Sequence, residues 1–223
     1  MECYYFGTFN PVHKGHIQTA TDVLNKFGFR EVIFVPAYSP CHKENCASSI
    51  DRFNMLKLIE NDEIKVSDIE FKLPTPSYSY QTIQEILKGK KSGEKVNFII
   101  GFDAFKNIEK WKNPEQLKEN IRFIVLKRTG EDRLEIEKLK EKGFDFIITD
   151  NIDTIDISSS EIREKVKNGS SINGLVDEKV KRYIEENDLY RRNWKYLKKR
   201  IVWRKIFAHS WSKRMCYWAC TKI

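Results

Sequence analysis

Five short apolar runs alternate with longer amphipathic segments, and this alternation is what most limits the possible folds of the chain. The runs are rich in β-branched and aromatic residues and stop at Gly, Pro or polar residues. This is typical of strands buried on both faces of a parallel sheet. They lie at residues 3–6, 31–36, 96–101, 122–127 and 144–149. The helical patterns lie at residues 14–27, 48–60, 79–89, 115–119, 131–142, 159–167 and 176–187.

Strands that alternate with helices are joined by right-handed βαβ crossovers. The pattern therefore predicts an α/β domain with a doubly wound parallel sheet. In such domains ligands bind beyond the carboxyl ends of the strands. The polar segments that follow predicted strands are thus the first candidates for a functional site.

The segment GTFNPVHKGH, residues 7–16, is the richest of these junctions. Gly7 would let backbone N–H groups approach an anion, and Thr8 adds a hydroxyl donor. His13 and His16 are three residues apart, so a helix that starts here would aim both at one point, near its positive N-terminal end. The residues alone leave two interpretations open: a phosphate site, or a turn with solvated histidines.

A second junction is DISSSEIRE, residues 156–164. Ser158 is a candidate helix cap, and the hydroxyls of Ser159 and Ser160 would then lie beside the first-turn N–H groups. Arg163, on the same helix, could direct its guanidinium fork at the same phosphate oxygens. An ordinary cap with a surface arginine is the alternative. Two phosphate-like junctions in one chain favour the functional interpretation.

The C-terminal segment differs from the rest of the chain in composition. Residues 191–223 hold eleven of the 40 Lys/Arg, none of the 32 Asp/Glu and four of the five tryptophans. The net charge of +8 therefore arises in this tail, and the other 190 residues carry a net charge of −3. We place a boundary near Tyr190, between a domain at 1–190 and a basic, Trp-rich tail at 191–223.

Several classes of protein are disfavoured by the sequence. No run of 18 apolar residues indicates a membrane span, and no basic region followed by an apolar stretch indicates a secretory signal. The five cysteines are irregularly spaced, which favours free thiols in a reducing cytoplasm. Cys41, His42 and Cys46 lie close together, but no four-ligand set has zinc-site spacing, so we predict no protein-bound metal.

These residues resemble the nucleotidylyltransferases of the HxGH type and, among them, the bacterial nicotinate-nucleotide adenylyltransferases. GTFNPVHKGH and ISSSEIR carry the resemblance, which covers about residues 1 to 190. Further matching segments follow in the family's order: SPCHKE (39–44), PSYSYQTIQEI (76–86), IIGFDAFKNIEKW (99–111), FIVLKRTG (123–130) and VKRYIEENDLY (180–190). Four residues depart from the family's pattern: Phe6 in place of the first of two glycines, Asn10 where Asp is common, Cys41 in place of a second proline and Gln81 in place of an acid.

The resemblance implies a Rossmann-like fold and transfer of the adenylyl group of ATP to nicotinate mononucleotide, by direct in-line attack and with Mg²⁺ on the ATP phosphates. It implies catalytic roles for His13, His16 and Arg163. ATP or phosphate binding falls to Gly7, Thr8, Phe9, Lys43, Gly101, Asp103, Ser159 and Ser160, with Asp103 accepting from a ribose hydroxyl. Nicotinate-nucleotide binding falls to Thr82, which would orient the carboxylate, and Trp111, which would stack on the pyridine ring.

Alternatives stay open at this stage. The same scaffold adenylylates nicotinamide mononucleotide or other phosphate acceptors. A homo-oligomer is compatible with the sequence. The tail interleaves cations with aromatic residues, a composition suited to nucleic acid or an anionic membrane surface. We favour the other interpretation, an accidental extension, because the resemblance stops at Tyr190 and the composition changes there.

Overall fold

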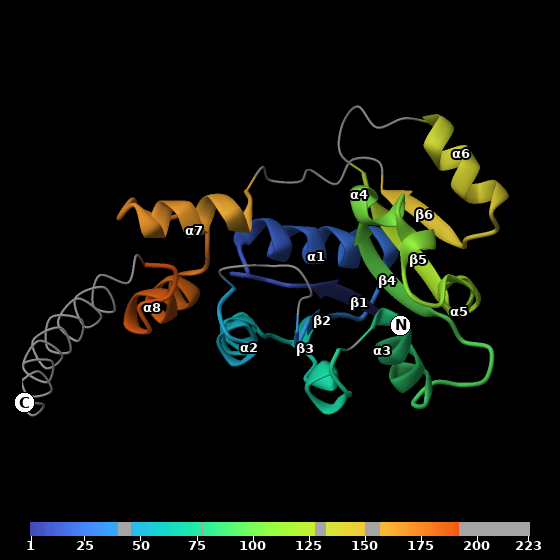
Figure 1. Cartoon of the computed structure of the whole chain (residues 1–223), viewed down its shortest axis with the longest axis horizontal. Helices are drawn as coiled ribbons and strands as arrows, with labels where there is room; N and C mark the ends of the chain where they lie inside the picture. Colours follow the sequence, from blue (N-terminus) through green and yellow to red (C-terminus); the bar gives the residue numbers. More distant parts are fainter. Residues whose placement is uncertain (40–45, 77, 128–132, 150–156, 192–223) are drawn as a thin grey trace, which may run out of the picture.

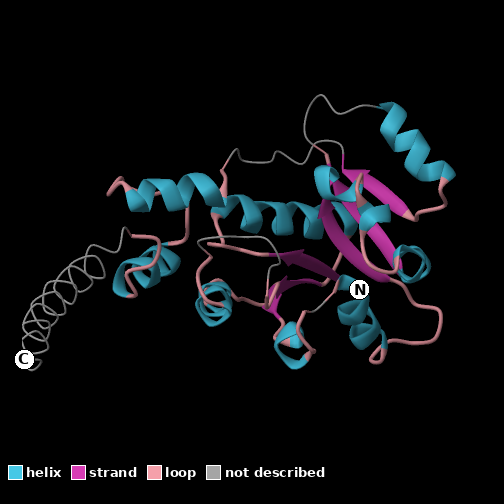
Figure 2. Ribbon diagram, in the orientation of Figure 1, coloured by secondary structure: helices cyan, strands magenta, loops and turns pink. Residues whose placement is uncertain are grey.

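The structure is a computed structural model that describes residues 1–39, 46–76, 78–127, 133–149 and 157–191. Its centre is a six-stranded, all-parallel sheet in the order β3-β2-β1-β4-β5-β6 (Figures 1 and 2). The strands are β1 (Glu2–Gly7), β2 (Glu31–Pro36), β3 (Ile64–Val66), β4 (Val96–Gly101), β5 (Ile121–Leu126) and β6 (Phe146–Thr149). This confirms the predicted α/β, doubly wound, Rossmann-like fold.

Helices lie on both sides of the sheet (Figure 1). They are α1 (Lys14–Phe27), α2 (Ser49–Lys57), α3 (Ser79–Leu87), α4 (Phe102–Phe105), α5 (Pro114–Asn120), α6 (Arg133–Glu141), α7 (Ser159–Lys167) and α8 (Glu178–Glu186). Two 3₁₀ turns, η1 (Ile69–Lys72) and η2 (Ile108–Lys110), complete the described elements.

Two hydrophobic clusters sandwich the sheet, because successive side chains of a strand point to opposite faces. Along β1, Cys3 belongs to the cluster that includes residues of α1, α2, α7 and α8, whereas Tyr4 belongs to the cluster of α3, α4, α5 and α6. β1 and β4 are adjacent although β2 and β3 intervene in sequence. The carboxyl ends of β1 and β4 therefore border the point where the winding direction reverses, the expected place for a ligand.

The helix ends follow local sequence signals. The side chain of Ser158 accepts a hydrogen bond from the N–H of Glu161, so the predicted cap of α7 is confirmed. Ser48 caps α2 in the same way through the N–H of Asp51. α1 ends at Gly28, whose φ of 65° lies in the left-handed region that glycine adopts without steric cost.

The sequence analysis missed two elements and misplaced the ends of two others. The sequence pattern gave five strands, and the edge strand β3 escaped it because three residues are too few to display a period. α4 follows β4 directly and was missed because it is a single turn. β6 starts at Phe146 rather than 144, and α2 ends near Leu58 rather than 60. The tail from residue 192 lies outside the described residues, so the boundary near Tyr190 stays a prediction.

Candidate active site

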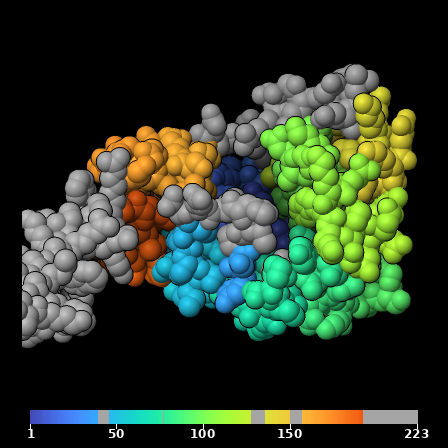
Figure 3. Space-filling view, in the orientation of Figure 1, coloured from blue at the N-terminus to red at the C-terminus, as the bar shows by residue number. Residues whose placement is uncertain are grey.

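A cavity of about 390 Å³ opens where the carboxyl ends of β1 and β4 meet α1, α4 and α7. In Figure 3 the β1–α1 region (dark blue) lies at the bottom of a depression between α7 (orange) and the α4 region (green). The cavity is lined by Tyr5, His13, Gly15, His16, Thr19, Gly101, Phe102, Asp103, Ala104, Leu126, Ile157, Ser158 and Ser159. Both predicted histidines, Gly101, Asp103 and Ser159 thus lie around one space.

His13 is the N-cap of α1 and is 6% exposed. Its Nδ1 is the buried side-chain polar atom for which the described residues offer no hydrogen-bond partner. Burial lowers the pKa of His13 to about 4, so the imidazole is neutral near pH 7. An unsatisfied buried polar atom is costly, and His13 is one of the residues that line the cavity.

His16 packs directly on His13, with ring centroids 3.7 Å apart. The backbone N–H of His13 donates to Nδ1 of His16 at 3.3 Å. From this bond we assign the proton of a neutral His16 to Nε2, the nitrogen on the far side of the ring. The edges of Phe9 and Tyr5 contact the same imidazole, at centroid distances of 5.0 and 6.0 Å. The two histidines therefore form a packed pair with little rotational freedom.

The turn at Gly7–Phe9 does not line this cavity, and its glycine has a structural reason. A Cβ on Gly7 would lie 2.8 Å from the ring of Phe9, so the ring of Phe9 requires the glycine. Phe9 itself has a φ of 49°, in the left-handed region that residues with side chains avoid. The carbonyl of Thr8 accepts a hydrogen bond from Arg52 at 2.9 Å. The turn is thus tightly held, whether or not a phosphate binds there.

The junction at residues 156–164 contacts the junction at residues 7–16. Ser159 donates from Oγ to the carbonyl of Pro11 at 2.9 Å, and Arg163 donates from NH1 to the carbonyl of Asn10 at 2.8 Å. NH2 of Arg163 also donates to Oγ of Ser160 at 3.1 Å. Residues about 150 positions apart are therefore brought together. Ser160 and Arg163 flank the cavity without lining it.

Asn10 explains one departure from the family pattern. Its Oδ1 accepts from the N–H of Ala47 at 3.0 Å and from the hydroxyl of Tyr190 at 2.8 Å. An amide oxygen performs this acceptor role as a carboxylate oxygen would. These bonds tie the β1–α1 loop (residues 8–13) to the end of the described chain.

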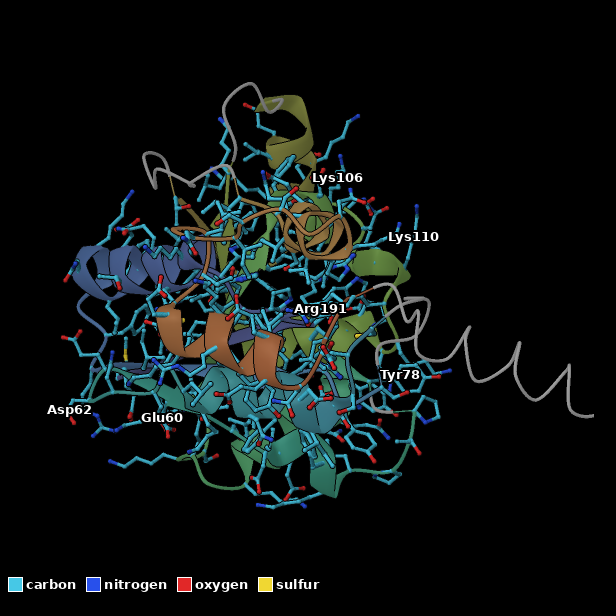
Figure 4. All side chains as sticks on the ribbon, turned by 90° about the vertical axis from the view of Figure 1, so that its left-hand side faces the viewer. Glu60, Asp62, Tyr78, Lys106, Lys110 and Arg191 are labelled. Carbon is cyan, nitrogen blue, oxygen red and sulfur yellow. The ribbon has the colours of Figure 1, made fainter. Side chains whose placement is uncertain are left out.

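Gly101 and Asp103 form the opposite side of the cavity. Gly101 is the N-cap of α4, and Asp103 lies in the first turn of this four-residue helix. The carboxylate of Asp103 is 73% exposed and pairs with Lys106 at 3.0 Å. Lys106 and Lys110 project from the same side of the molecule in Figure 4. Asp103 is therefore available to a ligand, unlike the buried His13.

Thr82 and Trp111 do not line this cavity. Thr82 is fully buried and donates to Oε1 of Glu70 at 3.0 Å, so as placed it supports the loop after β2 and does not offer its hydroxyl to a ligand. Trp111 is half-buried after η2 and packs edge-on against Phe98, with centroids 6.4 Å apart. Lys43 lies outside the described residues, as do Cys41 and His42.

Sequence comparison identifies the kind of protein to which this site belongs. A family model described as cytidylyltransferase-like matches residues 4–165. A relative from Clostridium tetani, named "Probable nicotinate-nucleotide adenylyltransferase", is 36% identical over 193 residues, covering 83% of this chain and 96% of the relative. The chain belongs to the nicotinate-nucleotide adenylyltransferase family. A relative of the same name from Caldicellulosiruptor bescii is 39% identical over 192 residues, covering 83% of this chain and 96% of the relative.

The fold is also found among solved structures. The Plasmodium falciparum nicotinic acid mononucleotide adenylyltransferase complexed with NaAD superposes with a TM-score of 0.68 at 21% identity, covering 85% of this chain and 96% of that one. At that identity the likeness speaks for the fold alone. The resemblance drawn from the motifs is confirmed. None of the described helices is long and apolar enough to cross a membrane.

Sequence reasoning missed two polar residues near the site of this adenylyltransferase-family chain, the half-buried Tyr5 and the buried Arg52. Tyr5 lines the cavity, and burial raises the pKa of its hydroxyl to about 12, so it stays protonated. Tyr5 was read as part of an apolar strand. Arg52 is 1% exposed in α2. It shares a helical stripe with Met55, Leu56 and Ile59, and a cation in an otherwise apolar stripe is a signal that could have singled it out.

Proposed function

We propose that this protein transfers the adenylyl group of ATP to nicotinate mononucleotide, giving nicotinate adenine dinucleotide and pyrophosphate. The observation that carries the proposal is that His13 and His16 line one cavity together with Gly101, Asp103 and Ser159. The buried Nδ1 of His13 has no partner among the described residues. Membership of a family whose relatives are named nicotinate-nucleotide adenylyltransferases supplies the reaction.

The reaction requires no nucleophile from the protein. A phosphate oxygen of the mononucleotide attacks the α-phosphorus of ATP and forms the new P–O–P link. The bond from the α-phosphorus to the oxygen that bridges it to the β-phosphorus breaks, and its electron pair leaves with pyrophosphate. Catalysis then consists of alignment and of stabilising the charge on the transferring phosphorus and the leaving group.

The two histidines supply donors for that charge. Both histidines line the cavity. A neutral His13 carries one ring N–H, and His16 can donate from Nε2. Because both groups are held by packing before any ligand arrives, little reorganisation is needed at the moment of reaction. Their partial burial also strengthens each hydrogen bond relative to one in water.

The α7 junction is proposed to take the pyrophosphate end. The first-turn N–H groups of Ser159 and Ser160 have no partner inside the helix and lie at its positive end. Arg163 has five N–H donors. One N–H on NH1 bonds to Asn10, and one N–H on NH2 bonds to Ser160. The remaining donors of Arg163 are proposed to bind phosphate oxygens, together with the backbone of Gly7, Thr8 and Phe9 in the turn.

The remaining assignments concern recognition. Asp103 is proposed to accept from a ribose hydroxyl beside Gly101, and Trp111 to stack on the pyridine ring. Lys43 is proposed to reach a phosphate, and Thr82 to act on the acceptor through Glu70 and the loop after β2. Mg²⁺ enters as the complex with ATP. No group of three His, Cys, Asp or Glu suited to a metal is found in the part of the chain that the structure describes. We propose that the reaction occurs in the cytoplasm.

Pyrophosphate release tests this function, with ATP and Mg²⁺ and either nicotinate mononucleotide or nicotinamide mononucleotide as acceptor. We expect release with the acid form and at least tenfold less, in kcat/KM, with the amide (about 1.4 kcal/mol). Release with the amide alone would keep the reaction and overturn the acceptor. Release with neither acceptor would overturn the proposed function.

A further inference from the structure

Arg52 is a buried cation outside the cavity lining. It lies in α2, is 1% exposed, and burial lowers its pKa below the usual value. No carboxylate of the described residues lies within ion-pairing distance of its guanidinium. A buried charge is costly unless other groups compensate it, so its hydrogen-bond partners indicate its use.

Those partners are backbone carbonyls from separate segments. Nε donates to Ala47 at 3.2 Å, NH1 to Thr8 at 2.9 Å, and NH2 to Tyr38 at 3.2 Å. Thr8 belongs to the turn after β1, whereas Tyr38 and Ala47 lie in the connection between β2 and α2. The rigid fork of a guanidinium holds these three carbonyls in one fixed arrangement, which a single ammonium could not reproduce.

The bond to Thr8 fixes more than one carbonyl. In a trans peptide unit the C=O and the following N–H point in opposite directions. Arg52 therefore sets the direction of the Phe9 N–H, which points away from the guanidinium. No hydrogen bond of that N–H is found within the described ranges. The left-handed φ of Phe9, 49°, is disfavoured for a residue with a side chain, so the turn needs such external support.

Tyr38, in the connection between β2 and α2, is held through both its N–H and its carbonyl group. The N–H of Tyr38 donates to Oε2 of Glu70 at 3.1 Å, and the carbonyl of Tyr38 accepts from Arg52. Glu70 is itself buried and accepts from Thr82. A continuous set of hydrogen bonds thus runs from α3, through Glu70 and Tyr38, to Arg52 and the turn after β1.

We propose that Arg52 is a positioning residue, which keeps the Phe9 N–H aimed at a phosphate group of ATP by holding the carbonyl of Thr8. The inference rests on the proposed function for its ligand. Arg52 does not touch ATP; it acts through the backbone of the turn. Its loss should lower kcat more than it raises KM, because a misdirected donor fails chiefly where charge develops.

The test uses the full chain with ¹⁵N-labelled phenylalanine, in which a Phe9→Leu variant assigns one amide resonance among the fourteen phenylalanines. The variants are Arg52→Met, which keeps the bulk without donors, and Arg52→Lys, which keeps the charge and serves if the first does not fold. Leu117→Ala is the matched control, since it truncates a residue 1% exposed in the other hydrophobic cluster, away from the turn.

We expect ATP to shift the Phe9 amide resonance in the wild type and in Leu117→Ala, and not in either Arg52 variant. The kcat of the Arg52 variants should fall about 100-fold, with KM for ATP within about threefold, while Leu117→Ala keeps both. An unresponsive Phe9 amide in the wild type, or Arg52 variants that match Leu117→Ala, would overturn the proposal. A Phe9 response without pyrophosphate release would leave the role of Arg52 standing and reject the proposed function.

Discussion

The two walls of the cavity are built in different ways. The β1–α1 wall carries His13, 6% exposed, at the head of a 14-residue helix, and its loop is tied to α7 through Ser159 and Arg163. The β4–α4 wall carries Asp103, whose side chain is 73% exposed on a helix of four residues. One wall is fixed before a ligand arrives, and the other remains adjustable.

This difference corresponds to two tasks. Stabilising charge in a transition state requires donors that are already in place and shielded from water. Recognising a sugar hydroxyl requires a carboxylate that can exchange its partner, and an exposed ion pair such as Asp103–Lys106 is weak enough to allow it. We infer that the first wall determines kcat and the second determines KM.

The largest expected effect follows from removing the fixed donor. His16→Ala should lower kcat by about 10²–10³, or roughly 3–4 kcal/mol, as for loss of one preorganised donor. Circular dichroism and thermal melting should show an intact fold. The measurement is steady-state pyrophosphate release. A kcat close to that of the wild type would break the assignment of the first wall.

The next effect concerns how the free energy of unfolding depends on pH. The pKa of His13 is about 4 in the folded state against 6.5 for an unperturbed histidine, so the unfolded chain binds more protons between these values. The free energy of unfolding should fall by about 3 kcal/mol on this account as the pH drops from 6.5 to 4, and not change above that window.

Urea denaturation at pH 7 and pH 4.5 checks this prediction, with wild type compared against His13→Gln. The variant should lose less stability on acidification than the wild type, whatever its stability at pH 7. Identical losses in the two proteins would show that His13 is not the buried, neutral group described above.

A smaller effect is expected at the adjustable wall. Asp103→Asn should raise KM for ATP about tenfold, or roughly 1.4 kcal/mol, because an amide is a weaker acceptor than a carboxylate for a ribose hydroxyl. kcat should stay within about threefold. The matched control is Lys106→Met, which removes the partner of Asp103 and should change KM by less than about threefold. A fall in kcat with Asp103→Asn would remove the contrast between the two walls.

The features predicted from sequence are those with a local signature. Apolar runs revealed five strands because a parallel strand is buried on both faces, and GTFNPVHKGH marked the histidine wall because its residues are contiguous. β3 offered three residues, two of them half-buried, and therefore no readable pattern.

Other features depend on contacts between distant residues. Arg52 bonds carbonyls 5, 14 and 44 positions away, so its role exists only in the folded chain. Thr82 was assigned to the acceptor because its segment matches a family motif, whereas its burial against Glu70 is a tertiary property. Tyr5 looked like one more strand residue, and only the position of the cavity singles it out.

The central claim is that the phosphates of ATP bind in the cavity beside His13. The most direct measurement is the pKa of His13 by NMR of histidine-labelled protein, with and without saturating ATP. Our account predicts a pKa of about 4 without ATP, raised by about one to three units when the negatively charged phosphates bind. The same pKa in both samples would contradict it.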